Sequence, residues 1–291
     1  MQRLIVTADD FGAAVEVNEA VEAAHRTGIL TAASLMVSGR AADDALACAR
    51  RNPNLRVGLH LVLTEGRPVL PPGSVSRLVD ADGSFRCDMA AMGVLFAASA
   101  AARRQLAAEI GAQFEAFRAT GLALDHCNAH KHFHLHPFIG SLIVSIGRRH
   151  GLRAARVPLE PAAILRKIEP GTPRLPALAL TPWALLLRRR FRAAGLITCD
   201  RVFGLQWSGA MTRERLCGLI AHLPAGLTEI YMHPASASYP GCAPGYRYRE
   251  ELEALIAPEV AAACRERALQ LGGFADFADA QAQTPSLHRA A

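Results

Sequence analysis

The sequence predicts an α/β fold, specifically a variant (β/α) barrel of the TIM type with insertions. Short apolar runs rich in β-branched residues alternate along the chain with longer amphipathic segments. Repeated units of this kind imply parallel strands joined by right-handed crossovers, in a doubly wound sheet or a barrel. At 291 residues the chain has the length of one barrel with insertions. We expect one domain over residues 1–278, with an apolar and basic insertion near 158–200, and a flexible tail over 279–291.

The order of the predicted elements supports this fold. Apolar runs of strand length occupy residues 4–8, 33–37, 57–63, 122–128, 152–157 and 228–232. Amphipathic segments of helix length occupy residues 18–26, 41–51, 103–119, 137–150, 212–222 and 250–271. Gly28 and Gly121 stand where two helices end, and Pro137 stands where another begins. The stretch after residue 63 is rich in proline and glycine, so we expect it to be irregular.

Composition excludes several classes of protein. Half of the residues are apolar (51%) and the mean hydropathy is +0.15, which excludes a disordered chain. The N-terminus passes directly from an apolar run into two carboxylates, with no secretory signal, so we expect a cytoplasmic protein. The seven cysteines are scattered without a C-x-x-C pair, which favours reduced thiols. No apolar run reaches the roughly 20 residues that a membrane-spanning helix needs.

The positive charge is concentrated in one place. A net charge of +6 over 291 residues is too small to predict nucleic-acid binding. However, the apolar run 176–187, which contains Trp183, is followed by four arginines, Arg188, Arg189, Arg190 and Arg192. This pattern is typical of a segment that lies at an anionic membrane surface. It is equally typical of a buried helix whose cationic C-terminus compensates the helix dipole.

Residues with metal-binding or acid-base character fall at the ends of predicted strands. They are Asp9 and Asp10 after the first strand, His60 in the third, His130, His132, His134 and His136 after the fourth, and His233 after the last. In barrels these ends form the active face, so the segments can converge on one site. Taken singly, the aspartates could instead cap a helix or bind an arginine, and His60 could be a core histidine.

A carboxylate and two imidazoles are the ligand set of a catalytic zinc ion with one open position. Magnesium, manganese or nickel are alternatives for such a site. Alternate residues on an extended chain lie about 6.6 Å apart, so only one or two histidines of the 130–136 cluster can bind one metal ion. We expect the others, His132 and His134 among them, to line the substrate pocket or to orient ligands.

Four motifs together resemble the YdjC/ChbG-like carbohydrate deacetylases. They are Thr7-Ala-Asp-Asp-Phe-Gly12 with Asn18-Glu19, Gly58-Leu-His-Leu-Val-Leu-Thr64, Asn128-x-His-x-His-x-His-x-x-Pro137 and Glu229-Ile-Tyr-Met-His-Pro234. The resemblance extends over roughly residues 3–275, with the motifs in family order. The run Asn-Ala-His-Lys-His-Phe-His-Leu-His-Pro is similar to the branch associated with hopanoid biosynthesis, called HpnK.

The resemblance implies metal-dependent removal of an acetyl group from an N-acetylated sugar, by a homodimer. By motif position, it assigns the role of metal ligand to Asp10, His60 and His130, the role of catalytic base to Asp9 and the role of catalytic acid to His233. Many relatives have Asp where this chain has Asn128, which can accept a hydrogen bond but has no charge to raise the basicity of a ligand. Arg156 stands at the end of the fifth predicted strand and is expected to anchor substrate or to hold a carboxylate, with a structural salt bridge as an equal alternative.

The substrate prediction combines the resemblance with the apolar and basic insertion. We expect an N-acetylglucosaminyl hopanoid, a glycolipid that a cytoplasmic protein would reach by peripheral association with the inner membrane. A soluble chitooligosaccharide is the alternative substrate, and a metal phosphoesterase is a further enzymatic alternative. From another class, the chain could be a non-catalytic lipid-binding module whose histidines only pack.

Overall fold

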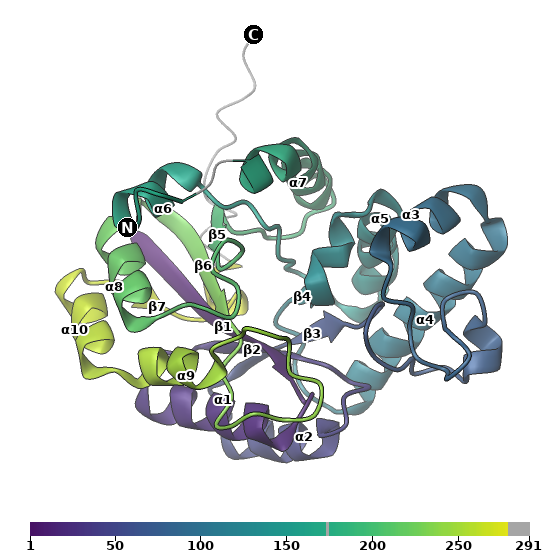
Figure 1. The fold of residues 1–291 in the computed structure, drawn as a ribbon, viewed down its shortest axis with the longest axis horizontal. Coiled ribbons are helices and arrows are strands. Elements are labelled where there is room, and N and C mark those ends of the chain that lie inside the picture. The colour runs from purple at the N-terminus through teal and green to yellow at the C-terminus, as the bar shows by residue number, and fades with distance from the viewer. Residues whose placement is uncertain (173–174, 279–291) are drawn as a thin grey trace, which may run out of the picture.

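The computed structural model describes residues 1–172 and 175–278, so the predicted tail over 279–291 lies outside the described residues. Within them, seven strands form one sheet in the order β4-β3-β2-β1-β6-β5, with β7 paired to β1. The strands are β1 (Gln2–Phe11), β2 (Ala32–Leu35), β3 (Arg56–Leu61), β4 (Cys127–Ala129), β5 (Arg201–Phe203), β6 (Gly226–Met232) and β7 (Gln270–Leu271). All six strand pairs are parallel. The predicted α/β barrel is confirmed as a curled half-barrel (Figure 1).

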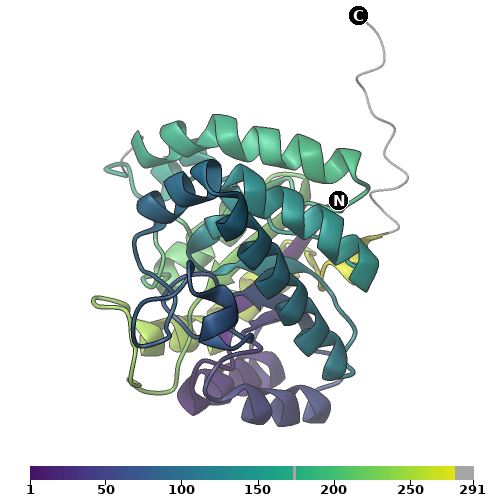
Figure 2. The ribbon, with the colours of Figure 1, turned by 90° about the vertical axis from the view of Figure 1, so that its right-hand side faces the viewer.

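Helices surround the curled sheet. They are α1 (Val15–Thr27), α2 (Ala42–Arg51), α3 (Met89–Ala98), α4 (Ala100–Ala119), α5 (Pro137–Gly147), α6 (Ala162–Ile168), α7 (Leu175–Ala193), α8 (Arg213–His222), α9 (Tyr248–Ile256) and α10 (Pro258–Glu266). In Figure 1, α1 and α2 lie below the sheet, α8 to α10 lie to the left, and α3 to α5 form a group to the right. Figure 2 shows α7 lying along the top of the molecule.

The burial of the central strand β1 explains why its sequence is a continuous apolar run. Leu4, Ile5, Val6 and Ala8 are completely buried, because β2 and β6 flank the strand and both of its faces pack into apolar clusters. Leu4, Val6 and Ala8 belong to the main core, and Ile5 belongs to a second, smaller cluster. Strands of parallel sheets are buried on both sides and therefore lack the alternation of half-exposed strands. The carboxyl ends of β1, β3, β4 and β6 consequently open on the same edge of a well-packed core.

Several element predictions are corrected by the structure. Residues 152–157 form no strand but only isolated bridges, Cys127 with Ala155 and Ala154 with Ile197. The predicted helix over 250–271 is two helices, because Pro258 begins α10 and cannot continue α9. The apolar run after residue 88 forms α3 and the start of α4, and the insertion 158–200 contains α6 and α7. The short strand β5 has no counterpart in the prediction.

Helix α7 has features of both structures predicted for the apolar and basic insertion, a buried helix and a segment at a membrane surface. On one side Ala184, Leu187 and Phe191 are buried, and Leu187 packs so closely on α5 that a Cβ at Gly140 would lie 2.7 Å from its side chain. On the other side Trp183 is 47% exposed, and Leu185 and Leu186 are 39% and 37% exposed. Neither α7 nor any other helix in the described residues has the length and apolar character needed to cross a membrane.

Candidate active site

Both aspartates at the end of β1 face the same site, although neighbouring residues of a regular strand point to opposite faces. The register of β1 against β2 shifts between Ala8 and Phe11, and Asp10 has a left-handed backbone with φ of 63°. This irregularity turns the second carboxylate back toward the first. The turn is then held by Asn18, whose Oδ1 accepts the backbone N–H of Gly12 at 2.8 Å. The motif Asp-Asp-Phe-Gly with its later Asn thus encodes one fixed turn.

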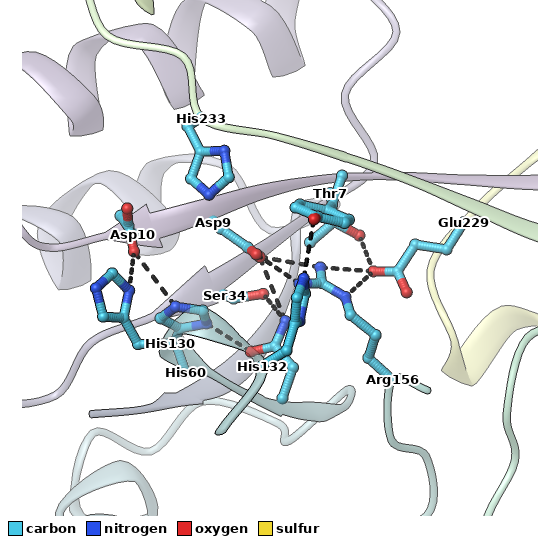
Figure 3. Close-up of polar contacts among 12 residues, drawn as sticks. Thr7, Asp9, Asp10, Ser34, His60, His130, His132, Arg156, Glu229 and His233 are labelled. Atoms are coloured by element: carbon cyan, nitrogen blue, oxygen red, sulfur yellow. Dashed lines mark hydrogen bonds and ion pairs between the residues drawn. The ribbon is translucent and has the colours of Figure 1, made fainter. Parts of the chain in front are cut away.

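Asp10, His60 and His130 form a group that could hold a metal ion. One ligand atom of each lies within 4.8 Å of the other two. Oδ1 of Asp10 lies 3.3 Å from Nε2 of His60 and 3.1 Å from Nδ1 of His130 (Figure 3). The turn after β4 explains why the histidines do not alternate along an extended chain. Lys131 and His132 have left-handed backbones, which fold this segment into a short 3-10 turn that brings only His130 to Asp10.

Each imidazole of this group is held by a second partner. Nδ1 of His60 lies 2.6 Å from Oδ1 of Asn128, and Nε2 of His130 lies 3.9 Å from Glu65. Burial opposes the charged form of His130, but the carboxylates of Asp10 and Glu65 outweigh it and raise its pKa to about 9. The amide of Asn128 therefore takes the position that the resemblance assigns to a carboxylate, and it does accept a hydrogen bond there.

Asp9 belongs to a separate, fully buried charge network. Arg156 binds both of its oxygens, with Nη1 at 2.5 Å from Oδ2 and Nη2 at 2.9 Å from Oδ1, and also contacts Glu229 at 2.7 Å (Figure 3). Thr7 donates to the same Glu229 carboxylate at 2.9 Å, and the guanidinium lies 4.5 Å above the ring of Tyr231. Burial alone would raise the pKa of Asp9, but the Arg156 charge holds that pKa well below its ordinary value.

His233 follows β6 directly and lines the same cavity as the two aspartates. Figure 3 shows its ring beside the two aspartates. Burial lowers the pKa of His233, although Asp10 and Asp9 act in the opposite direction. The backbone N–H of His233 donates to the buried Glu251, which also accepts the N–H of Met211 at 2.9 Å. A carboxylate on α9 thus holds the end of β6 and the loop before α8 together.

A cavity of about 1000 Å³ opens at these strand ends. Among the predicted site residues it is lined by Asp9, Asp10, His60, His130, His132 and His233. Three tyrosines, Tyr239, Tyr246 and Tyr248, form another part of its wall. The ring of Tyr246 lies 5.2 Å from that of His233. The cavity is therefore polar at the strand ends and aromatic along the loop after β6.

Not every predicted pocket residue lies on the cavity wall. His132 does, and its Nε2 lies 2.8 Å from the hydroxyl of Tyr231. His134 and Arg156 are completely buried and are not among the lining residues, so their placement does not support direct contact with a substrate. For Arg156 the alternative interpretation, that it holds a carboxylate, matches the contacts found.

Sequence reasoning missed Glu229, Tyr231, Glu65 and the tyrosine wall as members of this site. A usable signal existed for Glu229, because a carboxylate within a buried strand needs a cationic or hydrogen-bonding partner. No signal in the sequence indicated that Arg156 is that partner, since 73 residues separate the two. Tyr239 and Tyr246 belong to a loop and Tyr248 begins α9, so neither an alternating pattern nor a position at a strand end identifies them.

Comparisons with known proteins agree with this geometry. The profile of a family described as YdjC-like protein matches residues 3–266. A carbohydrate deacetylase from Geobacillus stearothermophilus is 32% identical, covering 94% of this chain and 97% of the relative. A carbohydrate deacetylase from Mus musculus is also 32% identical, covering 94% of each chain. A crystal structure of a protein from Enterococcus faecalis, with a provisional role in cellobiose-phosphate cleavage, superimposes with a TM-score of 0.75 at 24% identity, covering 95% of this chain and 98% of that one.

Proposed function

The chain belongs to the YdjC-like family, and on that premise we propose that it is a metal-dependent carbohydrate deacetylase that hydrolyses the N-acetyl group of an amino sugar. The observation that carries the proposal is the grouping of Asp10, His60 and His130 beside Asp9 and His233 in one cavity. Relatives at 32% identity over almost the whole chain are named carbohydrate deacetylases, which supports the same substrate class.

The residues present fit a divalent cation. The buried Nε2 of His60 makes no hydrogen bond among the described residues, and it lies 3.3 Å from the Asp10 carboxylate. An unpaired buried nitrogen of this kind is costly unless a ligand completes its coordination. One carboxylate and two imidazoles leave a position open and suit zinc best, while magnesium, manganese or nickel can also be bound by such groups.

An amide is a poor electrophile with a poor leaving group, so its hydrolysis needs an activated water, a stabilised oxyanion and a proton for the amine. A divalent cation supplies the first two by lowering the pKa of a water molecule and by polarising the carbonyl. We assign the acceptance of the water's proton to Asp9, because Arg156 keeps this carboxylate ionised at neutral pH.

We assign delivery of the proton to the departing amine to His233. Burial favours its neutral ring at neutral pH, so His233 must first take up a proton, and Asp9 faces the same cavity as the source. The neighbouring Tyr246 and Tyr248 offer apolar faces against which a sugar ring can stack. We assign His132, which lines the cavity and whose Nε2 lies 2.8 Å from the hydroxyl of Tyr231, to hydrogen bonding with a sugar hydroxyl.

A lipid-linked N-acetylglucosamine, such as a hopanoid glycolipid, is the substrate that we propose within this class. Thr181 of α7 lines the cavity, and the exposed Trp183, Leu185 and Leu186 follow it on the same helix. Arg189 and Arg190 are exposed and make no ion pair within the described residues, so they add cationic charge beside this apolar surface. Such a surface suits peripheral binding to an anionic membrane. A soluble chitooligosaccharide is the competing substrate.

The test measures acetate released by the purified, zinc-loaded protein. An N-acetylglucosaminyl lipid in anionic vesicles and soluble diacetylchitobiose are offered separately, with the His60→Ala variant as the inactive control. Turnover of the lipid supports the full proposal, and turnover of chitobiose alone overturns its lipid part. Acetate from neither substrate, together with phosphate release from a generic ester, would replace the proposal by the phosphoesterase alternative.

A further inference from the structure

A buried chain of hydrogen bonds ends on the proposed metal ligand His60. It runs from Asp125 through His126 and Ser34 to Asn128. We propose that Asp125, His126 and Ser34 are positioning residues that fix the amide of Asn128, so that His60 keeps its hydrogen on Nδ1 and presents a bare Nε2 to the cation. The inference rests on the proposed metal site, since the purpose of the bare nitrogen is to bind the ion.

The chain of hydrogen bonds from Asp125 to His60 is continuous, and every contact in it has hydrogen-bond length. Oδ2 of Asp125 lies 2.9 Å from Nδ1 of His126, whose Nε2 lies 3.0 Å from the hydroxyl of Ser34. Nδ2 of Asn128 lies 2.9 Å from the same hydroxyl, and its Oδ1 lies 2.6 Å from Nδ1 of His60. The residues come from β2, β3, β4 and the segment directly before β4, so the chain crosses three adjacent strands.

With His126 neutral, only one assignment of the hydrogens satisfies all these groups. Nδ2 of Asn128 also lies 3.3 Å from Oδ1 of Asp9, an ionised oxygen that can only accept, so the amide cannot be turned round. Ser34 then accepts from Asn128 and gives its own hydrogen to Nε2 of His126. Nδ1 of His126 donates to Asp125, and Nδ1 of His60 donates to Asn128. Every donor thus points away from His60 and toward Asp125, an arrangement in which successive bonds polarise one another.

The order Ser34, His126, Asp125 has the contacts of a serine hydrolase triad, but its location excludes that chemistry. Ser34 and His126 are completely buried, Asp125 is 4% exposed, and none of the three lines the cavity. A nucleophile must reach its substrate. These side chains therefore act through Asn128 and not on the substrate itself.

Asp125 and His126, at the end of the hydrogen-bond chain far from His60, are held firmly by their neighbours. Asp125 accepts the backbone N–H groups of Phe274 at 3.2 Å and Ala275 at 2.8 Å. The ring of His126 stacks on Phe274, with ring centres 4.6 Å apart, and it also packs directly against Gly58. A Cβ at Gly58 would lie 2.5 Å from this ring, so glycine is required there for the ring to fit. The ring has no room to reorient.

This arrangement explains how a neutral amide can occupy the place of a carboxylate beside the ligand. Asn128 gives one amide hydrogen to Ser34 and the other to Asp9, which an aspartate at this position could not do. The negative charge lies instead at the end of the chain, on Asp125, where it remains linked to His60 through the polarised bonds. One side chain thus serves both the proposed ligand and the proposed base.

The test uses Ser34→Ala, which interrupts the chain of hydrogen bonds at Ser34 without adding side-chain volume. Thr228→Val is the matched control, because it removes a buried hydroxyl that has no hydrogen-bond partner among the described residues. Nitrogen shifts of [15N]histidine-labelled, metal-free protein report which ring nitrogen of His60 carries hydrogen, with the signal assigned by its loss in His60→Gln. Zinc affinity is measured by competition with a chromophoric chelator, and near-UV circular dichroism verifies folding.

We expect His60 of the wild type to be protonated on Nδ1, and Ser34→Ala to mix the tautomers and weaken zinc binding about 10-fold. Thr228→Val should change neither. In an Asn128→Ala background, Ser34→Ala should have no further effect on affinity, because it acts through the amide. An unchanged tautomer and affinity in folded Ser34→Ala, or an equal loss in both backgrounds, would overturn the inference. If the wild type binds no zinc, the proposed function fails, while the tautomer measurement still decides the positioning role.

Discussion

Arg156 and Asp9 form a two-bond ion pair around a completely buried guanidinium, with both carboxylate oxygens held at 2.9 Å or less. A second carboxylate, that of Glu229, shares the same guanidinium. This pairing leaves two buried anions dependent on one cation.

Replacing Arg156 by Met should destabilise the fold by about 3–5 kcal/mol, because two buried carboxylates lose their partner. The measurement is the free energy of unfolding in urea. Arg213→Met is the control, since Arg213 pairs with Glu214 at an exposed site and its loss should change stability by less than about 0.5 kcal/mol. Equal stability of Arg156→Met and the wild type would contradict the buried pairing.

Asp9→Asn and His60→Ala should fail in different ways. Asp9→Asn should retain bound metal and lose roughly 10²–10⁴-fold in turnover, because a proton acceptor is removed while the ligands remain. His60→Ala should lose the metal. Metal content by elemental analysis and acetate release check the two variants, with His25→Ala, on α1, as control. Full activity in either variant would show that the assigned roles are wrong.

Removal of the metal should lower the melting temperature of the wild type, because an ion bound only to the folded state stabilises it by about 4 kcal/mol at a thousand times its Kd. The measurement compares melting with and without a chelator. His60→Ala should melt at the same temperature in both conditions. A preparation without divalent ions, whose melting the chelator leaves unchanged, would favour the non-catalytic lipid-binding alternative.

Glu251 should make the protein less stable as the pH rises from about 4.5 to 7. Burial raises the pKa of this carboxyl to about 7, from an ordinary value of 4.5, so across this window the folded state keeps a proton that the unfolded state has released. Glu251→Gln removes the titration and should flatten the curve of unfolding free energy against pH, by up to about 3 kcal/mol across the window. Glu250→Gln, an exposed neighbour, should leave the slope of that curve as in the wild type.

The double substitution Trp183→Ser and Leu186→Ser should weaken binding to anionic vesicles by about 2 kcal/mol, or roughly 30-fold, because two apolar side chains no longer enter the lipid. Co-sedimentation measures the binding. Turnover of soluble diacetylchitobiose should not change. Leu271→Ser is the control, since Leu271 is 40% exposed on β7, away from α7 in Figure 1. Undiminished vesicle binding by the double variant would exclude α7 as the membrane contact.

The fold and the three candidate metal-binding residues could be predicted because their signals are local. The apolar run of β1 and the polar residues that follow it lie within a few positions of each other in the sequence. A parallel sheet then brings the carboxyl ends of its strands together. Helix α3 was missed because its sequence is apolar on all sides and has no helical period. The predicted strand over 152–157 has an apolar composition, but its segment finds only isolated bridges at the edge of the sheet.

The remainder of the site depends on contacts between distant residues, which leave no trace in a local pattern. The pairing of Arg156 with Asp9 joins residues 147 positions apart, and Asp125 holds backbone groups about 150 positions away. The left-handed backbone of Asp10 also could not be predicted, because aspartate adopts it only where surrounding structure requires it.

The order of the strands has a consequence for synthesis of the chain. β1 to β4 are consecutive neighbours in the sheet, and all three proposed ligands lie within the first 130 residues. The ribosome therefore adds all three proposed ligands to the chain while Arg156, Glu229 and His233 have yet to be translated. Asp9, the proposed proton acceptor, is thus synthesised in the same early part of the chain as the proposed ligands. Its partner Arg156 and the proposed proton donor His233 come later, and only the arrival of β6 beside β1 brings all of them together.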